Sequence, residues 1–220
     1  MNASQRRRRS RPPGRRQLIG SALAAGLLAV VGFGRARSEA VRPDDPRALR
    51  PPGAIAEDAF GAACVRCGLC VQRCPFDVLH LAGEDGPVAA GTPYFRARDK
   101  ACLMCRDLPC QRVCPTGALG PRTLRIVDAR IGVAALAAPE HCYSFIGAAA
   151  CNSCWKACPL RTQGALVMRQ GLTARGGRFT PTVDAAVCTG CGLCEQACIA
   201  EQPAIRVAAL RDGLTRRPAA

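Results

Sequence analysis

Cysteine is the residue type in this sequence whose number and spacing could do chemistry. The chain has 220 residues, of which 16 are Cys and two are His. The cysteines form four groups of four: quartet one is Cys64, Cys67, Cys70 and Cys74; quartet two is Cys102, Cys105, Cys110 and Cys114; quartet three is Cys142, Cys151, Cys154 and Cys158; quartet four is Cys188, Cys191, Cys194 and Cys198. The quartets are separated by 27, 27 and 29 residues, so the chain contains an internal repeat.

Quartets one and four have the spacing C-x2-C-x2-C-x3-C, quartet two has x2, x4 and x3, and quartet three has x8, x2 and x3. In bacterial two-cluster ferredoxins, three thiolates of such a run bind one [4Fe-4S] cluster and the fourth binds the neighbouring cluster. Gly68 and Gly192 allow the tight turns that this geometry needs. We therefore predict that all sixteen cysteines bind the iron of four [4Fe-4S] clusters.

Two other uses of cysteine fit the sequence less well. Zinc ribbons pair two C-x2-C motifs, and three cysteines in C-x2-C-x2-C with a fourth at x3 do not have that spacing. A disulfide scaffold would need eight bridges in an exported chain.

The formal net charge of +15 suggests nucleic-acid binding, but its distribution does not. Residues 1–40 contain nine Arg and one Glu, so the rest of the chain carries +7. Four clusters with their thiolates, at about −2 each, bring that part to about −1. We expect no nucleic-acid partner and no small-molecule substrate. Because acid/base constellations and nucleotide loops are not apparent, we expect no catalytic residues and an electron-transfer protein instead of an enzyme.

The first forty residues have the pattern of an export signal. An Arg-rich stretch is followed by an apolar run from Leu18 to Phe33 and by the small-x-small sequence Ser38-Glu39-Ala40. The pair Arg15-Arg16 with the residues after it is similar to a twin-arginine signal. The apolar run of 16 residues is short for a membrane span, although an uncleaved anchor is the alternative. We predict a twin-arginine signal peptide at 1–40, a Pro-rich linker at 41–56 and a four-cluster domain at 57–220.

The predicted fold class is α+β: small tandem modules resembling bacterial dicluster ferredoxins, rich in loops and built around the clusters. Short strands are expected at 78–81, 124–127, 165–169, 179–183 and 205–207, and a helical turn or two at 131–138. Aromatic residues make up only 4% of the chain, so the clusters replace much of an ordinary core, and folding should depend on cluster binding.

Three segments carry a resemblance to a known family: the stretch Leu49-Arg50-Pro51-Pro52-Gly53-Ala54, the first quartet, and Gly91-Thr92-Pro93-Tyr94-Phe95. With them, the chain resembles the exported ferredoxin-type proteins of the MauM/NapG family, which serve methylamine utilisation or periplasmic nitrate reductase systems. The resemblance extends from the signal to about Val207 and includes the x8 gap of quartet three. The nitrate members end in a tail with His, Tyr and Trp, whereas residues 210–220 here contain no aromatic residue, which favours the methylamine branch.

The resemblance implies an electron relay in the periplasm, reached by the twin-arginine route. The implied partners are a membrane-bound quinol-oxidising iron–sulfur protein and a periplasmic c-type cytochrome, dehydrogenase or reductase. The alternatives are a NapG-like relay toward periplasmic nitrate reductase and, in a different class, a maturation factor for a periplasmic dehydrogenase.

The spacing leaves two ways to pair the quartets. Even gaps allow sequential pairing, one with two and three with four. Quartets one and four share one spacing, and quartets two and three each have an enlarged gap, so packing of like loops about a pseudo-twofold axis favours nested pairing. Related four-cluster subunits, which this chain resembles, are built in the nested way. We therefore predict an outer module from quartets one and four, with Cys74 joining Cys188, Cys191 and Cys194, and an inner module from quartets two and three.

Overall fold

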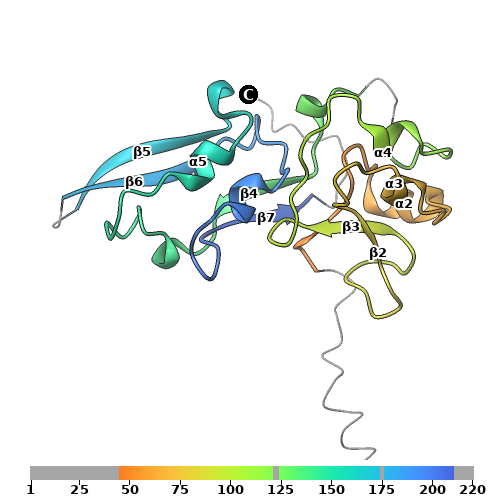
Figure 1. Cartoon of the computed structure of the whole chain (residues 1–220), viewed down its shortest axis with the longest axis horizontal. Helices are drawn as coiled ribbons and strands as arrows, with labels where there is room; N and C mark the ends of the chain where they lie inside the picture. The colour runs from red at the N-terminus through yellow and green to blue at the C-terminus, as the bar shows by residue number, and fades with distance from the viewer. Residues whose placement is uncertain (1–44, 121–123, 174–175, 211–220) are drawn as a thin grey trace, which may run out of the picture. The chain divides into compact units, whose positions relative to one another are not determined.

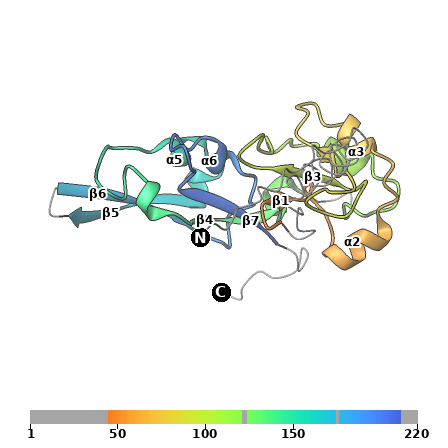
Figure 2. The same cartoon turned by 90° about the horizontal axis from the view of Figure 1, so that it is seen from below.

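A computed structural model describes residues 45–120, 124–173 and 176–210. The predicted signal peptide lies outside these residues. Helices in the described part are short, and none of them is long and apolar enough to cross a membrane. Figures 1 and 2 show small sheets and short helices joined by loops.

The first half of the described chain forms a three-stranded antiparallel sheet in the order β1-β3-β2. Strand β1 is Ala48–Leu49, β2 is His80–Leu81 and β3 is Pro93–Arg96. The helices of this half are α2 (Glu57–Ala63), α3 (Leu69–Gln72) and α4 (Pro109–Arg112). Phe60 of α2 and Phe95 of β3 are fully buried and, with Leu49, form the core of this half.

The second half contains two antiparallel strand pairs. Strand β4 (Gly132–Leu136) pairs with β7 (Ile205–Ala209), and β5 (Leu166–Thr173) forms a hairpin with β6 (Gly176–Val183). The helices are α5 (Ser153–Ala157) and α6 (Leu193–Gln196), with the 3₁₀ turns η1 (Ile126–Asp128), η2 (Pro139–His141) and η3 (Arg161–Gln163). Figure 2 shows α5 and α6 beside one another.

One hydrophobic core joins the two halves. It contains Phe60 and Leu119 from the first half and Leu166, Ile205 and Val207 from the second. Many cysteines belong to or pack against this core, so the thiols lie where a larger protein would have leucine or phenylalanine. The last strand also returns to the first: the Ala209 N–H donates a hydrogen bond of 2.8 Å to the Pro46 carbonyl.

The prediction of a Pro-rich linker is wrong for residues 45–56; residues 41–44 lie outside the described residues. Ala48 and Leu49 are fully buried, and Arg50 is almost so. The Arg50 guanidinium donates hydrogen bonds to the Thr92 hydroxyl and the Pro93 carbonyl, pairs with Glu57 and lies 4.7 Å from the centre of the Phe60 ring. These contacts hold the segment against α2 and β3, so the folded part begins before Glu57.

Strands were predicted well in the last third and poorly elsewhere. β5, β6 and β7 contain the predicted segments 165–169, 179–183 and 205–207, except for Ala165. The predicted helical turn at 131–138 is wrong, because Gly132–Leu136 is a strand paired along its length with β7. The predicted strand at 124–127 is also wrong, since it overlaps a 3₁₀ turn, and only His80–Leu81 of 78–81 is a strand.

Candidate metal centres

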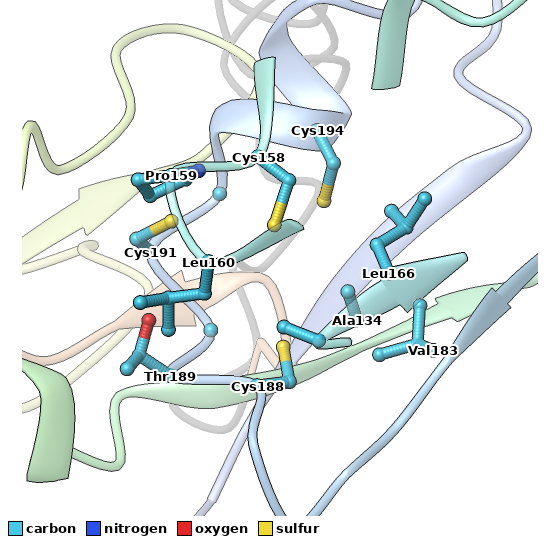
Figure 3. A pocket seen from close by; sticks show the side chains of 13 residues that line it. Ala134, Cys158, Pro159, Leu160, Leu166, Val183, Cys188, Thr189, Cys191 and Cys194 are labelled. Carbon is cyan, nitrogen blue, oxygen red and sulfur yellow. The ribbon is translucent and has the colours of Figure 1, made fainter. Parts of the chain in front are cut away.

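The sixteen cysteines line four cavities, four to each. Site A contains Cys64, Cys67, Cys70 and Cys114; site B contains Cys74, Cys102, Cys105 and Cys110; site C contains Cys158, Cys188, Cys191 and Cys194; site D contains Cys142, Cys151, Cys154 and Cys198. The cavities are similar in volume, between about 360 and 390 Å³ including their open mouths. Figure 3 shows the four sulfur atoms of site C directed into one space lined by apolar side chains, among them Leu166 and Val183.

Helices α3, α4, α5 and α6 each contain a cysteine of one site and are followed by a cysteine of the neighbouring site. Helix α3 contains Cys70 of site A and is followed by Cys74 of site B, and α4 contains Cys110 of site B and is followed by Cys114 of site A. In the second half, α5 and α6 connect sites C and D in the same way. The fourth cysteine of each quartet therefore reaches the neighbouring site, as the spacing predicts.

Nested pairing of the quartets is wrong. Cys74 lies with Cys102, Cys105 and Cys110, so quartet one pairs with quartet two. Cys198 lies with the first three cysteines of quartet three, so the other module combines quartets three and four. The predicted outer and inner modules do not form, because α3 packs against α4 and α5 packs against α6.

Turns with left-handed backbone aim the thiols into the sites. The residue before the second cysteine has positive φ in three quartets: Arg66 (57°), Met104 (55°) and Gly190 (72°). The residue that precedes the helix is also left-handed: Gly68 (73°), Leu108 (45°) and Gly192 (89°). The tight turns predicted at Gly68 and Gly192 are confirmed. Glycine adopts this backbone at no steric cost, whereas Arg66, Met104 and Leu108 are held in it by the surrounding fold.

Burial raises the pKa of eight of the sixteen thiols and so makes them poor acids without a metal. It raises the pKa of Cys102 and Cys110 to about 12 and that of Cys70, Cys154 and Cys191 to about 11. The other thiols of the sites add to each shift, since thiolates close together repel one another. A cationic cluster bound to all four sulfurs would compensate for this repulsion and burial.

Hydrogen bonds and burial have opposite effects on the pKa of Cys114. Burial raises its pKa, but the backbone N–H groups of Leu119, Thr116 and Ala118 and the Thr116 hydroxyl outweigh that effect, so the pKa is lowered. At site B the Val78 N–H points to the sulfur of Cys74, 3.4 Å away. N–H groups aimed at sulfur stabilise the thiolate and are the contacts that tune an iron–sulfur potential.

These features fit a [4Fe-4S] cluster better than the alternatives. All sixteen cysteines lie in the described residues, and none of them is in a disulfide. Within the described ranges, no three His, Cys, Asp or Glu side chains come close enough to hold one metal ion. Four thiols set around an apolar cavity suit a group in which each thiolate binds a different iron.

Sites B and C are neighbours across the boundary between the modules. The Cys102 N–H donates a hydrogen bond of 2.9 Å to the Cys191 carbonyl. After burial, Cys191 is the largest cause of the raised pKa of Cys102. In the same way, Cys70 of site A helps to raise the pKa of Cys110 in site B, and Cys154 of site D helps to raise the pKa of Cys194 in site C. The four sites therefore follow one another in the order A, B, C, D.

Residues that the sequence analysis did not identify hold this boundary together. The Arg98 guanidinium donates hydrogen bonds to the carbonyls of Cys198 (2.7 Å), Ala200 (3.0 Å) and Glu195 (3.2 Å). The Gln196 side chain accepts from the Ala101 N–H and donates to the Asp99 carbonyl. Gly192 packs so closely against this segment that an added Cβ would lie 2.5 Å from that of Ala97. No motif in the sequence marks Arg98, because its partners are backbone atoms about a hundred positions away.

Comparison with known proteins gives the same picture. Residues 63–118 and 149–201 match the 4Fe-4S dicluster domain, and each match includes cysteines of the two quartets that pair in the structure. The ferredoxin-type protein NapG of Escherichia coli (strain K12) is 46% identical over 198 residues, which cover 88% of this chain and 85% of that protein.

Two methylamine utilization ferredoxin-type proteins MauM are equally similar. The protein from Methylobacillus flagellatus is 47% identical over 85% of this chain and 80% of its own length. The protein from Methylorubrum extorquens is 45% identical over 93% of each chain. Identity at this level, spread across both cysteine modules, shows that the chain belongs to the family of ferredoxin-type electron-transfer proteins that includes NapG and MauM.

Proposed function

We propose that the sixteen cysteines hold four [4Fe-4S] clusters and that the chain relays single electrons along sites A, B, C and D. The hydrogen bond from Cys102 to Cys191 carries this proposal, because it joins ligands of the two modules directly. With it, the four sites form one path.

In such a relay the protein binds the clusters and surrounds them with apolar side chains. A [4Fe-4S] cluster takes up and releases one electron without breaking a bond, so the relay needs no acid or base. Side chains such as Leu160, Leu166 and Val183 keep site C apolar, and backbone N–H groups aimed at the sulfurs set the charge that each site tolerates.

Iron content and redox titration test this proposal. Anaerobically purified protein should contain about 16 irons per chain, and a titration followed by EPR should show clusters that are reduced reversibly. One zinc per cysteine quartet, or reduction that is not reversible, would contradict the relay.

We further propose that the protein works in the periplasm. The sequence features that support export are the Arg15-Arg16 pair, the apolar run and the small-x-small end of residues 1–40. A twin-arginine route carries folded proteins, so clusters inserted in the reducing cytosol would survive transfer to an oxidising compartment.

For its partners we propose a membrane-bound quinol-oxidising iron–sulfur protein as electron donor and a periplasmic c-type cytochrome, dehydrogenase or reductase as acceptor. We propose methylamine utilisation as the system that the relay serves, with periplasmic nitrate reduction as the alternative, since this chain is equally similar to the MauM and NapG proteins. A deletion strain should lose growth on methylamine and keep periplasmic nitrate reduction. The opposite result would assign it to the nitrate system, and unprocessed dehydrogenase with normal relay would indicate a maturation factor.

A further inference from the structure

The half-buried guanidinium of Arg98 lies against the loop that carries a cysteine of site D, although Arg98 belongs to the first module. It donates hydrogen bonds of 2.7 to 3.5 Å to five carbonyl groups, those of Glu195, Gln196, Cys198, Ala200 and Glu201. The two shortest bonds go to Cys198 and Ala200, and both of these residues line site D. The positive charge of Arg98 therefore lies beside site D.

The donors at two other fourth cysteines differ from the one at Cys198. The Cys74 carbonyl accepts the Asp77 N–H at 3.2 Å, which is a neutral donor. The Cys158 carbonyl accepts from the Arg161 guanidinium at 3.2 Å, but Arg161 is exposed. Water and salt screen an exposed charge more than a half-buried one. The charge at Cys198 should therefore act more strongly on its site than the charge at Cys158.

The charge of Arg98 is not neutralised by a carboxylate. Among residues 45–120, 124–173 and 176–210, no acidic side chain forms an ion pair with Arg98. Its neighbours Asp99 and Glu201 are exposed, so solvent screens their charges. Glu195 is buried and does interact with Arg98, but this single carboxylate interacts with three arginines, namely Arg206, Arg98 and Arg47. The net charge of this group is positive.

We propose that Arg98 raises the reduction potential of the cluster at site D and so favours the passage of electrons from site C to site D. This inference rests on the proposed relay. A reduced cluster carries one more negative charge than an oxidised one, so a fixed cation beside it stabilises the reduced form. In the step one electron leaves the cluster at site C, which is oxidised, and enters the cluster at site D, which is reduced; no bond is broken.

The contact between the modules acquires a second role in this way. Arg98 follows β3 of the first module, and its partners are backbone carbonyls of the second. The cation is therefore held beside site D only while the two modules are in contact. The first module thus supplies a charge that sets a potential in the second.

A redox titration followed by EPR tests the role of the charge. Arg98→Gln should disfavour the reduced form of the site D cluster about tenfold, which is about 59 mV for one electron. Arg98→Lys keeps the charge and should change this equilibrium less than about threefold. The signal of site D is identified by Cys151→Ala, because Cys151 lines that site outside the loop that Arg98 binds.

The control is Arg125→Gln, which removes an exposed charge and should leave all four potentials unchanged. Equal effects of Arg98→Gln and Arg98→Lys, the same shift at all four clusters, or no shift at site D would each overturn the inference. If the clusters of the unmodified protein are not reduced reversibly, the relay itself is wrong. If they are, and Arg98 has no effect, the relay stands and this inference alone fails.

Acetylation provides a second measurement if Arg98→Gln does not assemble. The chain has two lysines, Lys100 and Lys156, so the Arg98→Lys holoprotein has a third. Acetic anhydride removes lysine charges after the clusters are in place, and mass spectrometry verifies modification at position 98. The acetylated variant should disfavour reduction at site D about tenfold more than the acetylated unmodified protein. Equal potentials in the two acetylated proteins would overturn the inference.

Discussion

The backbone N–H of Cys102 donates a 2.9 Å hydrogen bond to the carbonyl oxygen of Cys191. These residues belong to different modules and are the first cysteine of quartet two and the second of quartet four. Around them Thr189 contacts the Met104 sulfur at 3.6 Å, and the buried core continues from one module to the other. A covalent and hydrogen-bonded route between sites B and C therefore passes through this one hydrogen bond.

Cys74 tests the sequential pairing. Replacement Cys74→Ala should remove or alter the cluster of site B, at a cost of up to about four of the 16 irons, because Cys74 lies with Cys102, Cys105 and Cys110. The EPR signals of sites C and D should remain. The matched change Cys198→Ala should alter site D instead, and a change at site C caused by Cys74→Ala would restore the nested arrangement.

Gly192 tests the fit between the modules. Gly192→Ala places a Cβ 2.5 Å from that of Ala97, in addition to the backbone cost of φ +89°. Gly164→Ala is the control, since Gly164 has φ +83° but an added Cβ there meets nothing within 4 Å. We expect about 1–2 kcal/mol of destabilisation from the backbone in both variants and about 1–3 kcal/mol more in Gly192→Ala. Chelator-induced bleaching of the clusters should accordingly be faster in Gly192→Ala; equal rates would contradict close packing at this boundary.

Arg98 tests whether the boundary depends on a single side chain. Arg98→Gln removes the guanidinium group that donates hydrogen bonds to carbonyls at the end of α6. We expect the free energy of unfolding to fall by about 2–3 kcal/mol. The control Arg125→Gln breaks an exposed pair with Asp128 and should leave the free energy of unfolding nearly unchanged, because solvent screens such a pair. Hydrogen exchange of the Cys102 amide should quicken in Arg98→Gln and stay unchanged in the control.

The arginine pair tests the export signal. Replacing Arg15-Arg16 by two lysines keeps the charge but removes the residues that a twin-arginine receptor recognises. The precursor should stay in the cytoplasm with its clusters, as judged by fractionation and immunoblotting. Undiminished appearance of the variant in the periplasm would show that another route is used.

The sequence predicts what depends on local spacing. The tight turns at Gly68 and Gly192 and the crossing of the fourth cysteine to a second site both follow from residues within ten positions of one another. The partner of each quartet does not, because gaps of 27, 27 and 29 residues are compatible with either pairing. Similar spacing in quartets one and four was misleading, since it describes the shape of each loop and not the helix that packs beside it.

Contacts between residues far apart in the sequence also explain the errors in the predicted fold. Residues 45–56 have the composition of a linker, yet they are buried because Arg50 binds Thr92 and Pro93 some forty positions later. Gly132–Leu136 contains good helix formers, but pairing with β7 outweighs that preference. Gly132 is needed there because an added Cβ would lie 2.5 Å from the Ala208 carbonyl oxygen.

The hydrogen bond from Ala209 to Pro46 has a consequence for the timing of folding during synthesis. The first strand region is completed by the last described strand, so the ribosome must make residue 209 before β1 and its neighbours gain all their contacts. Such sequence-distant contacts form late, and the chain stays partly open while the earlier cysteines emerge. The contact between β1 and β7 thus closes only after residue 209 has been made, whereas the cysteines of sites A and B are all present once Cys114 has been made.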